Sequence, residues 1–392
     1  MAEDTRDPME IAEERIAEAK RTGAKILYLN GLDLSALPES IGTAVGVVGL
    51  YLNSNQLHTL PAAIGNLENL VGLYLQHNQL AELPESLRQL VKLQKIVLDG
   101  NPGLGLPAEF GSDTLSKPIS SVKISHATPG QILDYYFRVV RGSRPLNEGK
   151  VILVGRGEVG KTSLVKRVVH DHFTLGEAIT HGINITRYPV QLDGDEITLH
   201  VWDFGGQEIM HGTHQFFLTE RSLYLLVLNG RAGDAKQQAE YWMQMIRSYG
   251  GDSPVLVVLN KQGQHPFDVD RDELTKRFPQ IAGFVRTDCA DNTGIDELRK
   301  AVAGVLGKMS SIRAKFPKSW FAIKDRLSGM AENFIGYEKF GTICDELGEK
   351  DPGGQESLAA VLHVLGIALN YRDDPRLNDT HVLNPQWVTG GI

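Results

Sequence analysis

The 392-residue chain is poor in cysteine: Cys289 and Cys344 are its only two, and they lie far apart and outside any metal-ligand spacing. This scarcity argues against a disulfide framework and predicts a reducing, cytoplasmic location. Long apolar runs are also missing. The longest ones, such as residues 223–228, have the length of a strand, so we expect no membrane span.

Positive charge is not in excess either. The formal net charge is −8, and no broad basic stripe is visible, which argues against a nucleic-acid-binding protein. Apolar residues make up 42% and charged residues 22% of the chain, as in soluble globular proteins. The length is sufficient for two or three domains with their own cores.

The first third of the chain repeats itself with a period of 23 residues. The spacing matches a leucine-rich repeat, in which one repeat cannot bury its own apolar edge and stacking is obligatory. We expect the asparagines to satisfy backbone groups where the chain turns away from each strand. The registers are Leu27, Leu50, Leu73 and Ile96; Leu29, Leu52, Leu75 and Leu98; Pro38, Pro61, Pro84 and Pro107; and Asn55, Asn78 and Asn101.

Three tyrosines, Tyr28, Tyr51 and Tyr74, occupy the same outward strand position in successive repeats. They predict a tyrosine strip on the concave face of the array. One interpretation is that this strip binds a partner protein or another part of this chain. The alternative is that tyrosine occurs there only because it is favoured in exposed strands. Helical spacing before the first repeat predicts a capping helix within residues 1–23. After the repeats, residues 111–148 read as a linker that carries a helix over 130–140.

The run from Gly155 to Thr162 fits the phosphate-binding pattern G-x-x-x-x-G-K-[ST]. A strand is expected before it and a helix after it, so backbone N–H groups and the helix N-terminus would point at a phosphate. Lys161 is expected to contact the β- and γ-phosphates and Thr162 to ligate magnesium. The predicted phosphate-site residues are Gly155, Gly157, Glu158, Val159, Gly160, Lys161, Thr162 and Ser163.

A second motif, Asp203-Phe204-Gly205-Gly206-Gln207-Glu208, follows a predicted hairpin. Asp203 is expected to hold magnesium through a water, Gly206 to donate its N–H to the γ-phosphate, and Gln207 to orient an attacking water. Thr180, between the two motifs, is the candidate switch threonine that meets magnesium and the γ-phosphate. The predicted catalytic residues are Gln207, Lys161 and Thr180, and the predicted magnesium ligands are Thr162, Thr180 and Asp203.

The segment Asn260-Lys261-Gln262-Gly263 follows a predicted strand at the place where Ras-like proteins read the base with N-K-x-D. Gly263 replaces the aspartate that accepts both guanine N–H groups, a loss that weakens base discrimination by about a few kcal/mol. Asp268 or Asp270 is a nearby candidate for compensation. The later base loop, usually S-A-K, reads Asp288-Cys289-Ala290. The predicted base contacts are Asn260, Lys261, Cys289 and Ala290.

These features together resemble the bacterial Roco proteins. The resemblance rests on the repeats, the segments 180–182 and 202–217, and residues 383–391, which are similar to the first half of a COR domain. It implies a Ras-like Roc GTPase domain with GTP, GDP and Mg²⁺, and dimerisation through COR that follows the nucleotide state. The chain ends soon after the COR-like segment, so we expect a truncated COR domain and a fragment that is monomeric.

The predicted fold is α/β: a short leucine-rich-repeat solenoid, a Ras-like P-loop domain with a mostly parallel sheet, and a small mixed C-terminal domain. The expected domains span residues 24–110, 149–308 and 309–392. In the last of these, helices are predicted over 320–334 and 357–369, with short loops and strands at 337–340 and around 370–388.

The predicted function is a slow GTPase switch with a repeat surface for an unknown or intramolecular partner. A scaffold stabilised by its nucleotide, and a signalling ATPase, are the alternatives.

Overall fold

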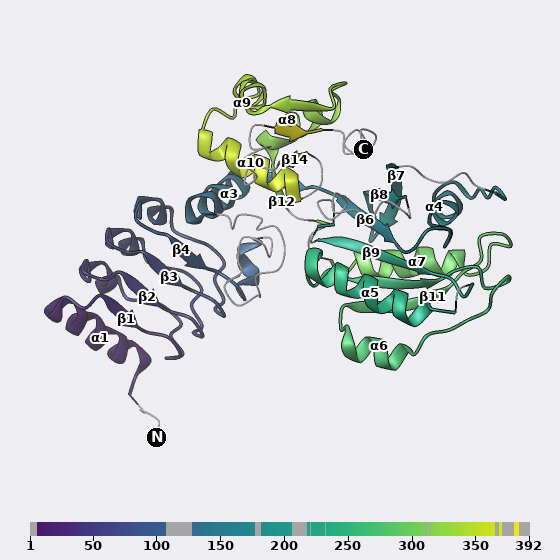
Figure 1. Cartoon of the computed structure of the whole chain (residues 1–392). Coiled ribbons are helices and arrows are strands. Elements are labelled where there is room, and N and C mark those ends of the chain that lie inside the picture. Colours follow the sequence, from purple (N-terminus) through teal and green to yellow (C-terminus); the bar gives the residue numbers. More distant parts are fainter. Residues whose placement is uncertain are drawn as a thin grey trace.

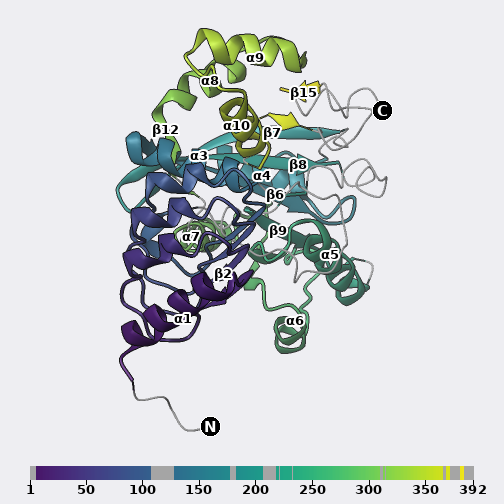
Figure 2. The ribbon, with the colours of Figure 1, turned by 90° about the vertical axis from the view of Figure 1, so that its left-hand side faces the viewer.

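The structure, a computed structural model, describes residues 6–106, 128–176, 182–205, 218–219, 221–231, 233–309, 312–313, 315–364, 368–370 and 380–383. Figure 1 shows the repeat array, the central sheet domain and a smaller C-terminal domain, with helix α3 between the array and the C-terminal domain. In Figure 2, seen from the side of the array, helices α8 and α9 of the C-terminal domain lie above it.

The repeat array is a four-stranded parallel sheet in which each strand pairs with the strand 23 residues further on. The period therefore sets the register, and the leucines of successive repeats stack in one core, with Leu73 and Leu75 fully buried. The elements are helix α1 (Pro8–Thr22); strands β1 (Ile26–Tyr28), β2 (Gly49–Tyr51), β3 (Gly72–Tyr74) and β4 (Lys95–Val97); and 3₁₀ helices η1 (Glu39–Thr43), η2 (Ala62–Asn66), η3 (Glu85–Gln89) and η4 (Pro102–Leu104).

The repeat asparagines act as predicted. Asn78 is buried, donates to the carbonyls of Leu52 and Leu75, and accepts from the N–H of Leu57 at 3.0 Å. Asn55 makes the equivalent bonds one repeat earlier. Each side chain thus satisfies at least three backbone groups that the turn out of the strand would leave without partners.

The central domain is a six-stranded sheet with strand order β11-β10-β9-β6-β8-β7, in which, of the strands described, β7 alone is antiparallel to its neighbour. The predicted hairpin is confirmed: β7 and β8 meet at a tight turn of Asp193 and Gly194. The strands are β6 (Glu148–Val154), β7 (Ile183–Leu192), β8 (Asp195–Phe204), β9 (Ser222–Leu228), β10 (Val255–Leu259) and β11 (Ile281–Arg286).

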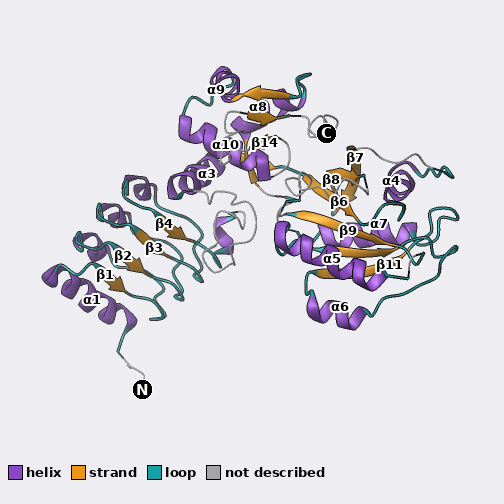
Figure 3. Cartoon of the chain, in the orientation of Figure 1, coloured by secondary structure: helices purple, strands orange, loops and turns teal. Residues whose placement is uncertain are grey.

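Helices cover both faces of this sheet (Figure 3). Alternate residues of β6 point to opposite sides, so Ile152 packs in one core with helix α5 and Leu153 in the other with helices α4 and α7. The helices are α4 (Lys161–His170), α5 (Ala235–Tyr249), α6 (Arg271–Arg277) and α7 (Ile295–Leu306).

The C-terminal domain differs from the sequence prediction in its helix boundaries. Helix α8 ends at Ser328, so Phe334 belongs to a strand, and residues 337–340, predicted as loop or strand, begin helix α9. Helix α10 starts at Pro352, five residues before the predicted start. The elements are β12 (Lys315–Pro317), α8 (Lys318–Ser328), β13 (Phe334–Gly336), α9 (Tyr337–Glu346), α10 (Pro352–Val364), β14 (Leu369–Asn370) and β15 (Thr380–Val382).

Helix α3 (Pro129–Arg141) joins the array to the C-terminal domain. It begins with a capping box, in which the side chain of Thr128 accepts from the N–H of Gln131 and the Gln131 side chain accepts from the N–H of Thr128. On the array side, the Tyr136 hydroxyl accepts from the N–H of Leu83 at 3.0 Å. The apolar core continues from the array through α3 into the C-terminal domain.

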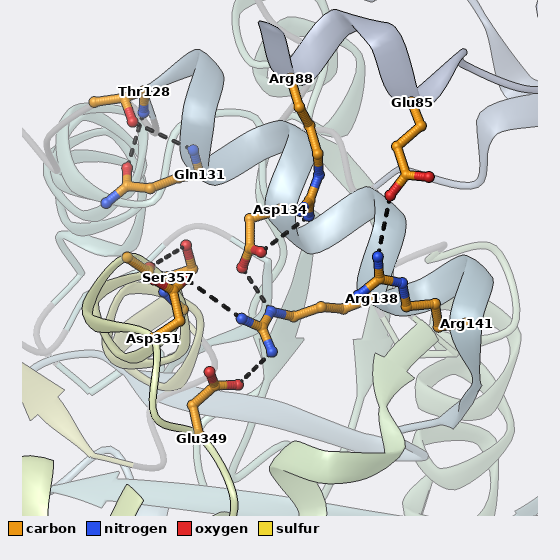
Figure 4. Close-up of polar contacts among 12 residues, drawn as sticks. Glu85, Arg88, Thr128, Gln131, Asp134, Arg138, Arg141, Glu349, Asp351 and Ser357 are labelled. Carbon is orange, nitrogen blue, oxygen red and sulfur yellow. Dashed lines mark hydrogen bonds and ion pairs between the residues drawn. The ribbon is translucent and has the colours of Figure 1, made fainter. Parts of the chain in front are cut away.

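A line of charged side chains crosses α3 (Figure 4). Asp134 lies between Arg88 of the array, at 3.2 Å, and Arg138, at 2.6 Å. Arg138 reaches Glu349 of the C-terminal domain at 2.5 Å, and Glu349 also accepts from the indole N–H of Trp320 at 2.9 Å. We call Arg88, Asp134, Arg138 and Glu349 the α3 clamp. Burial alone would lower the pKa of Arg138. The surrounding carboxylates raise it by more than burial lowers it, so the pKa lies above its ordinary value.

We expect Arg138→Ala to lower the free energy of unfolding by about 3 kcal/mol, because it leaves the Glu349 carboxylate, whose side chain is 2% exposed, buried without its cation. The matched control is Arg141→Ala on the same helix, whose pair with Glu85 is exposed and should cost less than about 1 kcal/mol. Urea unfolding followed by tryptophan fluorescence measures both. Equal losses would contradict this account of the clamp.

Candidate functional site

The predicted phosphate loop joins β6 to α4, and its glycines are where the backbone needs them. At Gly155, with φ of 141°, an added Cβ would clash with the carbonyl of Val227 on the neighbouring strand. At Gly160, with φ of 93°, it would lie 2.6 Å from the Asn260 side chain. Gly160 is also the N-cap of α4, so the helix opens directly onto the loop.

Lys161 is the first residue of α4 and turns back over the loop. Its Nζ donates to the carbonyls of Gly155 at 2.8 Å and Arg156 at 3.1 Å, and the residue is 5% exposed. Burial lowers the pKa of Lys161 to about 8, against a smaller opposing effect of Asp203. The ammonium therefore sits inside the loop with backbone carbonyls as its partners, where phosphate oxygens would be stronger ones.

The predicted magnesium ligands Thr162 and Asp203 meet directly. The Thr162 hydroxyl donates to Asp203 Oδ2 at 2.6 Å, whereas Oδ1 of the same carboxylate is buried and has no hydrogen-bond partner among the described residues. Burial raises the pKa of Asp203, although Thr162 and Lys161 oppose the shift. The Thr162 hydroxyl and the Asp203 carboxylate thus lie together, and Asp203 Oδ1 remains as a buried acceptor. These oxygen ligands suit a hard divalent cation or a water molecule bound to it.

The first base-loop residues are anchored to the phosphate loop. Asn260 is 1% exposed, donates to the carbonyl of Val159 at 2.9 Å, and accepts from the Thr287 hydroxyl at 3.0 Å. Lys261 Nζ donates to the carbonyl of Glu158 at 2.8 Å. Asn260 and Lys261 thus bring the carboxyl end of β10 against the loop that follows β6.

Asp288, which the sequence interpretation did not include among the base contacts, joins the two base loops. Its Oδ2 accepts from the N–H of Gly263 at 2.8 Å and its Oδ1 from the N–H of Ala290 at 2.9 Å. The available signal was the combination of a glycine in the N-K-x-D segment with an acid in the later loop. The thiol of Cys289 is buried near Asn260, and burial, with Asp288 nearby, raises its pKa to about 12.

The two acids proposed to compensate for Gly263 have other partners. Asp268 pairs with Arg271 and Arg286, and Asp270 caps helix α6 by accepting from the N–H of Glu273 at 2.9 Å. Because both carboxylates are held in these contacts, the geometry does not support a base-reading role for either.

The remaining predicted residues divide into two groups. Gly157 lies in the turn of the phosphate loop, and Ser163 lies in the first turn of α4. Thr180, Gly206 and Gln207 lie outside the described residues.

The C-terminal domain contacts the strand that leads into the phosphate loop. Lys324 of α8 lies 2.5 Å from Glu148 at the start of β6, and His200 of β8 contacts the same carboxylate at 3.1 Å. Burial tends to raise the pKa of Glu148, but these two partners outweigh it and hold the pKa below its ordinary value. The Glu148 carboxylate thus connects strands β6 and β8 to helix α8 of the C-terminal domain.

Three family models match the chain. The leucine-rich-repeat model matches residues 46–102, the model described as "Ras of Complex, Roc, domain of DAPkinase" matches residues 150–263, and the "C-terminal of Roc, COR-A domain" model matches residues 317–392. The chain therefore combines a repeat array, a Ras-like Roc domain and a COR-A domain. Among the described residues, no helix has the length and apolar character that a membrane crossing requires.

A solved structure, Methanosarcina barkeri Roco2 RocCORdC bound to GDP, is 46% identical with a TM-score of 0.59, and covers 64% of this chain and 76% of that one. On this evidence the chain belongs to the Roco family. Among curated relatives, a Roc-COR-CHAT protease of Runella zeae is 30% identical over 63% of this chain, and the probable serine/threonine-protein kinase pats1 of Dictyostelium discoideum is 28% identical over 66%. The chain spans 29% and 9% of the lengths of these two relatives.

The buried Lys161 predicts a pH-dependent stability difference in the nucleotide-free protein. Because its pKa is about 8 when folded and 10.5 ordinarily, the unfolded chain binds a proton between these values that the folded chain has released. The wild-type free energy of unfolding therefore rises with pH across this window. We expect Lys161→Met to be more stable than wild type near pH 7.5 and to lose about 2 kcal/mol of that advantage by pH 10.

Chemical unfolding at a series of pH values measures the difference, with Lys276→Met on the exposed face of α6 as the control for losing a lysine charge. A Lys161→Met advantage that stays constant from pH 7.5 to 10 would contradict the buried, depressed state of Lys161.

Proposed function

We propose that this chain is a guanine-nucleotide switch that binds GTP and GDP with Mg²⁺ and hydrolyses GTP slowly. The observation that carries the proposal is the arrangement of Lys161, Thr162 and Asp203: a buried ammonium inside a glycine loop, beside a carboxylate with one oxygen that no described residue binds. This arrangement suits a phosphate chain and its counterion. The Methanosarcina barkeri Roco2 structure is bound to GDP, which supports the choice of nucleotide.

Magnesium would be held by Thr162, by Asp203 through a water, and by Thr180 in the GTP state. When bound, it supplies positive charge that neutralises phosphate oxygens. The protein's own contribution is positional: the N–H groups of Gly157, Glu158, Val159, Gly160 and Ser163 cradle phosphate oxygens, and Lys161 exchanges its carbonyl partners for phosphate oxygens. Gly206 would donate to the γ-phosphate, and Gln207 would orient the attacking water.

The output we propose is a change in domain arrangement. Glu148 ties β6, and with it the phosphate loop, to Lys324 of COR-A. COR-A is tied in turn to the repeat array through the α3 clamp. A nucleotide-dependent movement of β6 against α8 would therefore be carried to the array by helix α3.

Three further proposals complete this account. The protein forms a homodimer through its COR domain. The tyrosine strip, in which Tyr51 and Tyr74 stack at 4.4 Å, serves a protein or intramolecular partner. The protein works in the cytoplasm.

Hydrolysis is tested by phosphate release from GTP. We expect Lys161→Ala to lose nucleotide binding and turnover, and Gln207→Ala to keep binding while turnover falls roughly 10-fold or more, because it no longer orients the water. Gln79→Ala, in the exposed part of the array, is the control and should match wild type. Unchanged turnover in both site variants would contradict the GTPase proposal and favour the nucleotide-stabilised scaffold.

Coupling is tested by fluorescence energy transfer between dyes on cysteines placed at Val91 in the array and Leu175 in the Roc domain, which are 88% and 82% exposed. Both native cysteines are buried, which favours labelling at the two introduced sites. We expect the transfer efficiency to differ between GDP and a non-hydrolysable GTP analogue, and Arg138→Ala to reduce that difference. Equal efficiencies with both nucleotides in the wild-type protein would contradict the coupling.

A further inference from the structure

Asp288, in the later base loop, contacts Gly263, which stands at the fourth position of the segment that resembles N-K-x-D. The Asp288 side chain crosses from the loop after β11 to the loop after β10, where the Gly263 N–H binds it at 2.8 Å. The Ala290 N–H fixes the other oxygen at 2.9 Å. A carboxylate has about four lone-pair positions, so two acceptor positions remain after these two bonds.

Gly263 provides space and not an unusual backbone conformation. Its φ is outside the left-handed region, so a residue with a side chain could adopt the same backbone. An added Cβ, however, would lie 3.0 Å from Asp288 Oδ2, and the nearest atoms to it belong to that carboxylate. The absence of a side chain at position 263 therefore provides the space that the Asp288 carboxylate occupies.

We infer that Asp288 reads the purine base and replaces the aspartate absent at position 263. The inference rests on the proposed function, since it places the phosphates in the loop after β6. Strands β10 and β11 are two and three strands away from β6, roughly 10 and 14 Å. A nucleoside diphosphate spans that distance, and ligands of such sheets bind outside the carboxyl ends of the strands.

The chemistry of a fixed carboxylate selects guanine. Guanine presents two adjacent donors, N1–H and the exocyclic amino group, which two acceptor positions of Asp288 can receive together. Adenine presents an unprotonated ring nitrogen at the corresponding position, and its lone pair would face the negative charge. Since Asp288 is 5% exposed, its charge is little screened by water, which strengthens the discrimination.

Calorimetric titration of the nucleotide-free chain with GDP and with xanthosine diphosphate tests the assignment. Xanthine carries an oxygen where guanine carries the amino group, so the amide of Asp288→Asn can donate to that oxygen and accept from N1–H. We expect wild type to prefer GDP, and Asp288→Asn to lose roughly 100-fold or more in GDP affinity while xanthosine diphosphate becomes the better ligand. Asp268→Asn and Asp270→Asn are matched controls and should keep the wild-type preference.

A positional swap provides a second test if Asp288→Asn fails to fold. Gly263→Asp alone sets two carboxylates against each other and should weaken GDP binding, whereas the double variant Gly263→Asp with Asp288→Ser should recover it, because the carboxylate then projects from 263 into cleared space. Binding of GDP by wild type with an unchanged preference in Asp288→Asn, or no recovery in the double variant, would overturn the assignment. Absence of any nucleotide binding in wild type would instead overturn the proposed function.

Discussion

The shared direction of five parallel strands is the constraint on which the candidate site depends. Because β6, β8, β9, β10 and β11 run the same way, their carboxyl ends meet at one edge of the sheet. The phosphate loop, Asp203, Asn260 and Asp288 each follow or end a different strand, so residues up to about 130 positions apart in sequence come together there. The buried faces of the strands hold this geometry, since helices pack on both sides of the sheet.

The α3 clamp gives the same chain a second organising contact outside the sheet. Glu349 is buried in COR-A and is acceptable there because Arg138 and the Trp320 indole both bind it. The α3 clamp therefore connects the array to COR-A. The ion pair between Lys324 of COR-A and Glu148 connects COR-A to β6. Through these contacts the Roc domain is connected to the array by way of COR-A.

Patterns with strict spacing allowed the sequence to predict most of this structure. The 23-residue period specified the registers of Leu73 and Asn78, and the glycine–lysine motif specified the loop before α4, because in both cases the geometry follows from residue type and interval. The COR-A helices were placed wrongly: apolar spacing continues past Ser328 to Phe334, which packs as a strand against β15. The contact between Asp288 and Gly263 was missed because the Asp288 side chain crosses between loops 25 residues apart, and patterns within a single segment carry no such contact.

The measurement that tests the central claim most directly is a calorimetric titration of the nucleotide-free chain with GDP, GTP, ADP and ATP in magnesium buffer. The account predicts micromolar or tighter binding of both guanine nucleotides and no measurable binding of the adenine nucleotides. Comparable affinity for both bases, or no binding of either, would contradict a guanine-nucleotide switch. That result would favour a scaffold that acts through the surface of the repeat array.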